Sequence, residues 1–262
     1  AGRTPGLRRS AASEVQCGLV RRATKSPDGS VIRRVIDNRQ VQIAYQPIVD
    51  FKSQKIFAYE ALARPNREDF DGPMALFASA VAENVTGELG RLLRELSLAG
   101  CQTHPLFINI HPAELNEKWV VQPDDPLFNH VEDVFLEITE AVPLTHFRLC
   151  QNMLAEVRGR GVHLVVDDLG AGYSNLKYIA DLHPRIVKLD RELVAGLTKD
   201  TRLYKLVTAI VRMCEDLESK VVAEGIETKE ELDAVTSAGA RYGQGYFLAR
   251  PAYPPPVINI RS

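Results

Sequence analysis

Two adjacent carboxylates end an apolar run near the middle of the chain, in the segment HLVVDDLGAGYSNL at residues 163–176. Ionised carboxylates that leave water repel each other and cost several kcal/mol unless a cation neutralises them. Other polar side chains interrupt or follow short apolar runs elsewhere, and they include four further acids and one lysine. The whole set is Glu60, Asn109, Glu137, Asp167, Asp168, Lys188, Asp190, Glu224 and Gln244.

The strong metal ligands in this set are all oxygen atoms. If Glu60, Glu137, Asp167, Asp168 and Glu224 converge, they cannot all stay ionised without cations. Oxygen donors suit hard cations such as Mg²⁺ or Mn²⁺, and no His or Cys pair with zinc-ligand spacing accompanies them. Any one of these acids is as often structural as functional, so the hypothesis depends on their convergence.

A pair of such ions would explain the two adjacent aspartates. Two metals roughly 3.5–4 Å apart cleave phosphodiesters by activating water and stabilising charge on the phosphate. Either Asp167 and Asp168 serve one ion each, or Asp167 bridges both. Lys188 is suited to hold the attacking water or a phosphate oxygen. The chemistry that this set favours is therefore the hydrolysis of a phosphate ester.

The elements that must position these side chains alternate along the chain. Segments 41–49 and 55–64 have the pattern of strands, and the link 50–54 is too short for a helical crossover, so they are predicted to form an antiparallel hairpin. Further strands are predicted at 106–110, 133–139, 162–168, 185–190, 220–225 and 241–247. Helices are predicted at 30–40, 73–84, 87–102, 146–161, 174–182, 200–217 and 228–239.

This order predicts an α/β fold, a modified (β/α)8 barrel of the TIM type with an antiparallel first strand. A doubly wound open sheet is the alternative. The chemistry of such barrels lies at the carboxyl ends of the strands, where the polar set falls. Consecutive side chains on a strand point to opposite faces, so the second aspartate must turn back at the frayed end of its strand.

Composition limits the setting in which the chain works. Its 262 residues are 45% hydrophobic, with no apolar run long enough to cross a bilayer and no secretory signal pattern. Four widely separated cysteines without a CxxC pair indicate a reduced, cytoplasmic protein. Residues 1–34 carry eight cations and two acids, a balance of +6 that leaves −8 for the remainder. We expect residues 1–30 to be a basic, flexible arm or linker and residues 255–262 to be a tail.

Several motifs resemble those of one known family. YEALAR (59–64) is similar to the motif that names the EAL domain of bacterial cyclic di-GMP phosphodiesterases. YQPIVD, NIHP, LEITE, DDLGAGYSNL, VKLD, AEGIET and QGYFLARP follow in the order and at the spacing of that family. An isolated Glu-Ala-Leu carries no information, but the ordered set is specific. The resemblance covers about residues 31–252, within an expected domain at 31–254.

The resemblance implies an activity, cofactors and partners. Family members have a modified (β/α)8 barrel with one antiparallel strand and hydrolyse cyclic di-GMP to linear pGpG with Mg²⁺ or Mn²⁺. It implies one or two ions per site, inhibition by Ca²⁺, a homodimer, and a regulatory domain outside this chain.

The resemblance also assigns roles to individual residues. Glu60, Asn109, Glu137 and Asp167 would bind one metal, and Asp167, Asp168 and Glu224 the second. Lys188 matches the lysine that holds the attacking water, Glu224 also matches a candidate general base, and Glu60 and Asp167 complete the catalytic set. Glu140 matches a residue that stabilises the glycine-rich loop after 162–168. The positions implied to contact the nucleotide or support its pocket are Gln46, Leu62, Arg64, Asp190, Glu227 and Gln244.

Two other functions compete with this hypothesis. Some EAL domains have lost acids or the lysine and only bind cyclic di-GMP as receptor modules, whereas none of these residues is missing here. A metal nuclease that acts on a long strand is disfavoured by the charge of −8 on the body of the chain, because polyanions bind basic surfaces. We therefore expect a phosphodiesterase that acts on cyclic di-GMP, without DNA as a partner.

Overall fold

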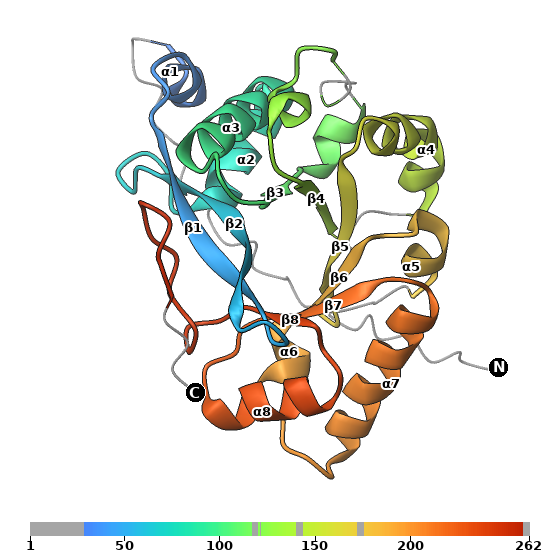
Figure 1. The fold of residues 1–262 in the computed structure, drawn as a ribbon. Helices are drawn as coiled ribbons and strands as arrows, with labels where there is room; N and C mark the ends of the chain where they lie inside the picture. Colours follow the sequence, from blue (N-terminus) through green and yellow to red (C-terminus); the bar gives the residue numbers. More distant parts are fainter. Residues whose placement is uncertain (1–28, 117–119, 121, 140–143, 172–175, 259–262) are drawn as a thin grey trace, which may run out of the picture.

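The computed structural model describes residues 29–116, 120, 122–139, 144–171 and 176–258. Eight strands form a closed barrel in which the order in space follows the order in sequence, and the main helices surround it on the outside (Figure 1). The predicted barrel is therefore confirmed, and the open sheet is excluded. The strands are β1 Val41–Asp50, β2 Lys55–Pro65, β3 Leu106–Asn109, β4 Val134–Thr139, β5 His163–Leu169, β6 Ile186–Leu189, β7 Lys220–Ala223 and β8 Tyr242–Gly243.

The first strand runs against both of its neighbours. Strand β1 pairs with β2 along its whole length, from Val41 opposite Pro65 to Asp50 opposite Lys55, and all pairs from β2 to β8 are parallel. The hairpin predicted from the short link is therefore confirmed. Only the last two residues of β1 pair with β8, and an isolated bridge joins Tyr45 of β1 to Ala252 farther along the chain.

Strand β8 is much shorter than the segment 241–247 that the sequence predicts. After Gly243 the chain turns toward the loop that follows β7, where Phe247 N donates to Ile226 O at 3.0 Å. A Cβ atom on Gly245 would lie 2.1 Å from Ile226 O, so only glycine permits this approach. The turn brings Gln244 and the residues after it to the carboxyl mouth of the barrel.

The helices pack on the strands through narrow apolar stripes. Helix α7 (Arg202–Asp216) is capped by the Thr201 side chain and buries Val207, Val211 and Cys214, which share one face at a spacing of three to four residues. No described helix is long and apolar enough to cross a membrane. The other helices are α1 Val31–Asp37, α2 Pro73–Ala82, α3 Thr86–Gly100, α4 Leu144–Gly159, α5 Lys177–Leu182, α6 Arg191–Val194 and α8 Lys229–Ser237.

Apolar side chains fill the barrel interior at its amino-terminal end. Phe107 and Phe135, from β3 and β4, are buried there with ring centroids 4.5 Å apart and nearly parallel planes. Ile48, Val165 and other buried residues complete this layer. The apolar filling of one end leaves the carboxyl end of the same strands for polar side chains.

A buried arginine fixes the long connections on the side of α3. Arg94 is 1% exposed, and its guanidinium contacts Asp125 at 2.8 Å and Glu114 at 2.5 Å. Glu114 belongs to a short 3₁₀ helix (Pro112–Asn116), and Asp125 caps another (Pro126–Asn129). Gly90 on α3 leaves room for Glu114, since a Cβ atom there would lie 1.8 Å from its Oε2. These short helices and α6 were not predicted from the sequence.

Candidate metal centre

Lys188 lies at the centre of a ring of acids contributed by different strands. Its Nζ atom is 2.5 Å from Glu137 Oε1, 2.7 Å from Glu224 Oε1 and 3.1 Å from Asp167 Oδ1. Glu60 Oε1 completes the ring at 3.6 Å. The lysine is 1% exposed and Glu137 is fully buried, so these charges interact in a poorly solvated environment. Strands β2, β4, β5 and β6 and the residue after β7 thus bring the predicted acids and the lysine together.

Amide side chains hold Glu60 in place. Asn109 Nδ2 donates to Glu60 Oε1 at 3.2 Å, and Gln244 Nε2 donates to Glu60 Oε2 at 2.5 Å. The same Gln244 nitrogen donates to Gln46 Oε1 at 2.9 Å, and Gln46 Nε2 donates to Ala249 O at 3.2 Å. The two oxygens of Glu60 are therefore oriented by Asn109 at the end of β3 and by Gln244 after β8, and Gln46 on β1 holds Gln244 in turn.

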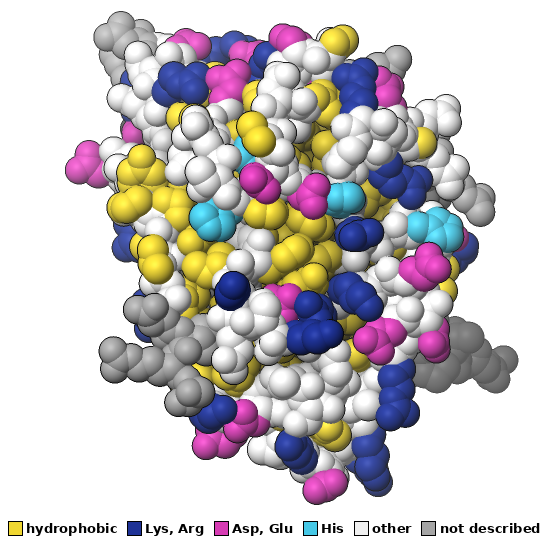
Figure 2. Space-filling view, viewed as in Figure 1, with side chains coloured by type: hydrophobic (Ala, Val, Ile, Leu, Met, Phe, Trp, Pro, Cys, Tyr) yellow, Lys and Arg dark blue, Asp and Glu magenta, His cyan; other side chains and the backbone are white. Residues whose placement is uncertain are grey.

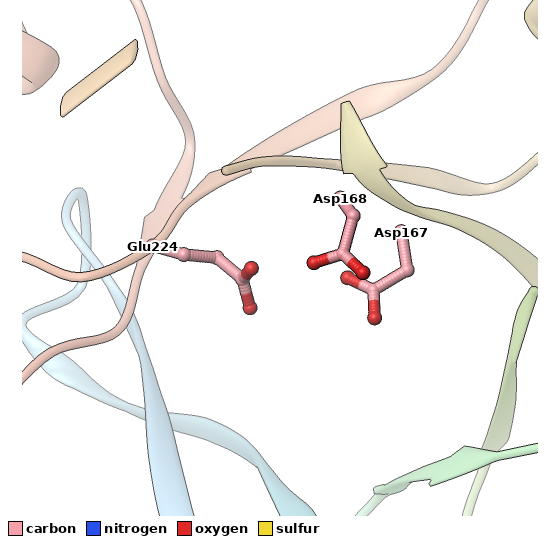
Figure 3. A group of neighbouring side chains, drawn as sticks. All are labelled: Asp167, Asp168 and Glu224. Carbon is pink, nitrogen blue, oxygen red and sulfur yellow. The ribbon is translucent and has the colours of Figure 1, made fainter. Parts of the chain in front are cut away.

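The backbone explains how two adjacent aspartates face one site. The pairing of β5 with β6 shifts between Val166 and Leu169, and Asp168 has a φ of 58°, in the left-handed region. Such a bulge breaks the alternation of side chains along a strand, and aspartate tolerates this region better than most residues. Figure 3 shows both carboxylates directed toward Glu224, and ligand oxygens of all three residues lie within 4.8 Å of one another.

Burial and mutual repulsion change the pKa values of these groups. Burial raises the pKa of Glu224 to about 8, although the neighbouring Lys188 opposes the shift. Burial, with a contribution from Asp167, raises the pKa of Asp168 to about 6. Burial also raises the pKa of Glu137 well above its usual value. Burial alone would lower the pKa of Lys188, but the surrounding carboxylates raise it.

The donor set and its charge fit divalent cations. Five carboxylates and one lysine leave a formal charge of −4 when all are ionised, which two divalent ions would balance. Both Glu137 carboxylate oxygens and Asp167 Oδ1 are buried without a hydrogen-bond donor in suitable geometry among the described residues, despite their proximity to Lys188. Buried oxygens without donors, in an oxygen-only set, are typical of sites for Mg²⁺ or Mn²⁺.

A pocket of about 290 Å³ opens beside the acids. It is lined by Glu60 and Glu224 and by residues from the first strands, from the ends of β6 and β7, and from the segment after β8. Five of the six residues predicted to contact substrate lie in this lining. They are Gln46, Leu62, Asp190, Glu227 and Gln244.

Two predicted residues are not placed at this site. Arg64 is exposed and donates to the backbone oxygen of Ala63 at 3.0 Å, and it does not line the pocket. Arg64 is therefore the one of the six predicted substrate-contact residues that does not line this pocket. Glu140, predicted to stabilise the glycine-rich loop, lies outside the described residues.

Two further residues organise the pocket and were missed from the sequence. Arg191 lines it and pairs with Glu227 at 2.8 Å. Glu231 accepts hydrogen bonds from the backbone nitrogens of Gly196, Glu227 and Thr228, which fixes the loop that carries Glu224. Arg191 directly follows VKLD at the end of a predicted strand, and this position indicates that it could lie at the site. Glu231 shows the sequence pattern of a helix capping box, which Thr228 completes.

The family model described as EAL domain matches residues 30–251. Among curated proteins, the chain is 30% identical over 247 residues to the probable cyclic di-GMP phosphodiesterase PdeB of Escherichia coli K12, covering 84% of this chain and 44% of PdeB. It is 29% identical over 224 residues to the blue light- and temperature-regulated antirepressor BluF of the same organism, covering 79% of this chain and 53% of BluF.

A solved structure agrees with the sequence comparison. The manganese and cy-diGMP complex of BlrP1 from Klebsiella pneumoniae matches with a TM-score of 0.69 and 32% identity, over 81% of this chain and 56% of the BlrP1 chain. The chain spans about a third to a half of the length of the curated relatives that it matches.

Proposed function

The chain belongs to the EAL domain family, and on that basis we propose that it hydrolyses cyclic di-GMP to linear pGpG in a reaction that depends on Mg²⁺ or Mn²⁺. One observation carries the proposal: the ring of acids around Lys188 is complete and stands beside a pocket at the carboxyl mouth of the barrel. The named function of PdeB and the manganese and cy-diGMP complex of BlrP1 support it.

The candidate ligands of the cations fall into two overlapping groups. Glu60, Asn109, Glu137 and Asp167 would hold one ion, and Asp167, Asp168 and Glu224 the other. Bound ions would supply the positive charge that activates water and stabilises the phosphate in the transition state. An oxygen-only set of this kind discriminates against soft metals, and Ca²⁺, which prefers longer bonds and looser geometry, would inhibit rather than support turnover.

The protein groups would divide the remaining work. Lys188, held by four carboxylates, would orient the attacking water through its Nζ atom. Water attacks the phosphorus, the bond from phosphorus to one ribose oxygen breaks, and the released oxygen takes up a proton. Glu224, whose pKa is raised by burial, would accept the proton that the water loses. Gln46, Leu62, Asp190, Glu227 and Gln244 would hold the nucleotide.

A receptor module that binds cyclic di-GMP without hydrolysing it is the second candidate. The similarity to BluF supports this second candidate, because BluF is named as an antirepressor and not as an enzyme. We expect a module that has lost catalysis to lack one of the acids or the lysine. All of these side chains are present and converge here, so the enzyme is the better proposal.

Incubation of the purified chain with cyclic di-GMP and Mn²⁺, followed by chromatography of the nucleotides, tests the proposal. We expect pGpG to accumulate with the parent chain and not with Asp167→Asn. An exchange of exposed Lys199, which does not line the pocket beside the acids, is the matched control and should leave turnover unchanged. Binding of cyclic di-GMP without any pGpG would favour the receptor, and the absence of both would refute a role in cyclic di-GMP chemistry.

The setting of the domain completes the proposal. We infer a cytoplasmic homodimer. We also infer that a regulatory region outside this chain controls it, because the curated relatives are about 1.6 to 3 times as long. Light scattering during size-exclusion chromatography tests the dimer. A monomer at every protein concentration would refute it.

A further inference from the structure

A second and larger cavity opens at the opposite end of the barrel, away from the acids. This amino-terminal pocket has a volume of about 640 Å³, within the range of small-molecule sites. It is lined by the β1–β2 turn, by residues at the start of β2, β4, β6 and β7, and by β8. Active sites of such barrels lie at the carboxyl face, whereas the amino-terminal face serves stability. The proposed hydrolysis therefore does not account for this pocket.

Aromatic rings form one wall of the amino-terminal pocket. Phe57 and Tyr242 stack with ring centroids 4.2 Å apart and planes 17° apart, and the Phe135 ring meets Phe57 edge-on at 5.5 Å. Phe57 and Tyr242 are only partly buried. Figure 2 shows hydrophobic side chains at the centre of this face of the molecule. A wall of this kind favours a flat aromatic ligand, because aromatic rings pack well by offset stacking or edge to face.

Cations line the same cavity. Arg185 lies directly before β6 and Lys220 begins the neighbouring strand β7, where Lys220 N donates to Arg185 O at 3.1 Å, and both side chains are exposed. Neither they nor Lys52 has an ion-pair partner within the part of the chain that the structure describes. Arg241 differs, because it pairs with Asp50 at 2.6 Å and lies over the Tyr242 ring at 5.7 Å. Lysine and arginine side chains also gather beside the hydrophobic centre in Figure 2.

Acidic side chains in the same pocket reduce its long-range electrostatic attraction for anions. Asp133, Glu215 and Glu218 also line it, and Asp133 lies 3.5 Å from His163. The lining is thus close to neutral overall, so an anion must be held by direct pairing with a specific cation. Arg185 is the best candidate, because its planar guanidinium can bind a carboxylate through two parallel hydrogen bonds.

We propose that the amino-terminal pocket binds a small aromatic acid, with the ring against Phe57 and Tyr242 and the carboxylate on Arg185 and Lys220. The ring would bury the apolar wall, and the carboxylate would pair two cations that lack partners. The site is separate from the carboxyl mouth, so this proposal stands whether or not the chain hydrolyses cyclic di-GMP.

A titration followed by NMR tests the proposal with two matched ligands. Indole-3-propionate carries the ring and a carboxylate, and tryptamine carries the same ring with an ammonium group instead. We expect indole-3-propionate to bind with a Kd of about 1 mM, which is ordinary for a ligand of this size, and tryptamine to bind at least about tenfold more weakly. The methyl signals of Ile186, which lines the pocket, should move, and those of Leu62 at the carboxyl mouth should not.

Variants of exposed arginines separate the site from general binding. Arg185→Gln should weaken the binding of indole-3-propionate by about tenfold. Arg212→Gln removes an arginine that is also exposed but does not line the pocket, and it should have no effect. The proposal is overturned if indole-3-propionate causes no saturable shift of Ile186, if tryptamine binds equally well, or if Arg185→Gln binds like the parent chain.

Discussion

Replacement of Lys188 by methionine tests how the acidic ring is held together. The change keeps most of the bulk of the side chain and removes its charge. Among the described residues, Lys188 is the cation that contacts the ring, at distances of 2.5 Å to Glu137 and 2.7 Å to Glu224. The variant therefore leaves buried carboxylates without a positive partner, unless protons or metal ions take its place.

The expected magnitude follows from the burial of these charges. Removal of one partner from a buried ion pair costs about 3–5 kcal/mol in the free energy of unfolding. The carboxyl groups can take up protons, which places the expected loss near the lower end, at about 3 kcal/mol. For a domain of this size, that loss lowers the melting temperature by about 6–12 °C. Divalent ions should restore much of this loss, because they supply the missing positive charge.

Thermal unfolding in EDTA and in saturating Mn²⁺ measures both effects. Mn²⁺ should raise the melting temperature of Lys188→Met more than that of the parent chain, and Lys199→Met, at an exposed lysine, should behave like the parent. In the hydrolysis assay, Lys188→Met should lose about 10²-fold or more in kcat with a smaller change in KM. A variant that melts like the parent in EDTA and keeps its kcat would refute the central role of Lys188.

Four further perturbations address the metal site and the scaffold. Glu60→Ala should lower hydrolysis by about 10²-fold or more because it removes a ligand, and near-normal turnover would show that the site is misplaced. EDTA should abolish hydrolysis, and Mg²⁺ or Mn²⁺ but not Ca²⁺ should restore it; full turnover in EDTA would exclude the metal mechanism. Calorimetry should find that Mn²⁺ affinity falls as the pH drops from about 8 to about 6. The reason is that Glu224 and Asp168, whose pKa values are raised to about 8 and about 6, must lose their protons before they bind the metal. An affinity that does not change with pH would contradict this. Arg94→Met should lower the free energy of unfolding in urea by about 3–5 kcal/mol, whereas Arg212→Met should change it by less than about 0.5 kcal/mol, and an unchanged midpoint for Arg94→Met would contradict the role of the buried cluster.

The barrel was predictable because its signals are local. Short apolar strands alternate with amphipathic helices, and the five-residue link at 50–54 permits only a hairpin between the first two strands. The convergence of the acids then followed from the rule that parallel strands of a barrel end at one mouth. The sequence alone therefore predicts that Lys188, Glu137 and Glu224 lie together, and their roles stay predictions.

Other features depend on contacts that no local pattern reports. The left-handed backbone of Asp168 results from a shift in pairing between β5 and β6, and the short β8 results from packing against Ile226. Arg94 occupies a helix position that suits a surface arginine, but it is buried by partners 20 and 31 residues away. Arg64 fits the family motif and yet is exposed outside the pocket.

The two ends of the barrel separate stability from chemistry along the same strands. Strands β3, β4 and β5 contribute Phe107, Phe135 and Val165 to the apolar amino-terminal layer. At their other ends, β4 and β5 carry Glu137, Asp167 and Asp168, whose mutual repulsion opposes folding, and β3 carries Asn109. Binding of cations would remove this repulsion only in the folded chain, so metal affinity and stability are linked through the same carboxylates. An acidic mouth can therefore be retained for chemistry because the apolar layer and the buried Arg94 cluster hold the fold together without it.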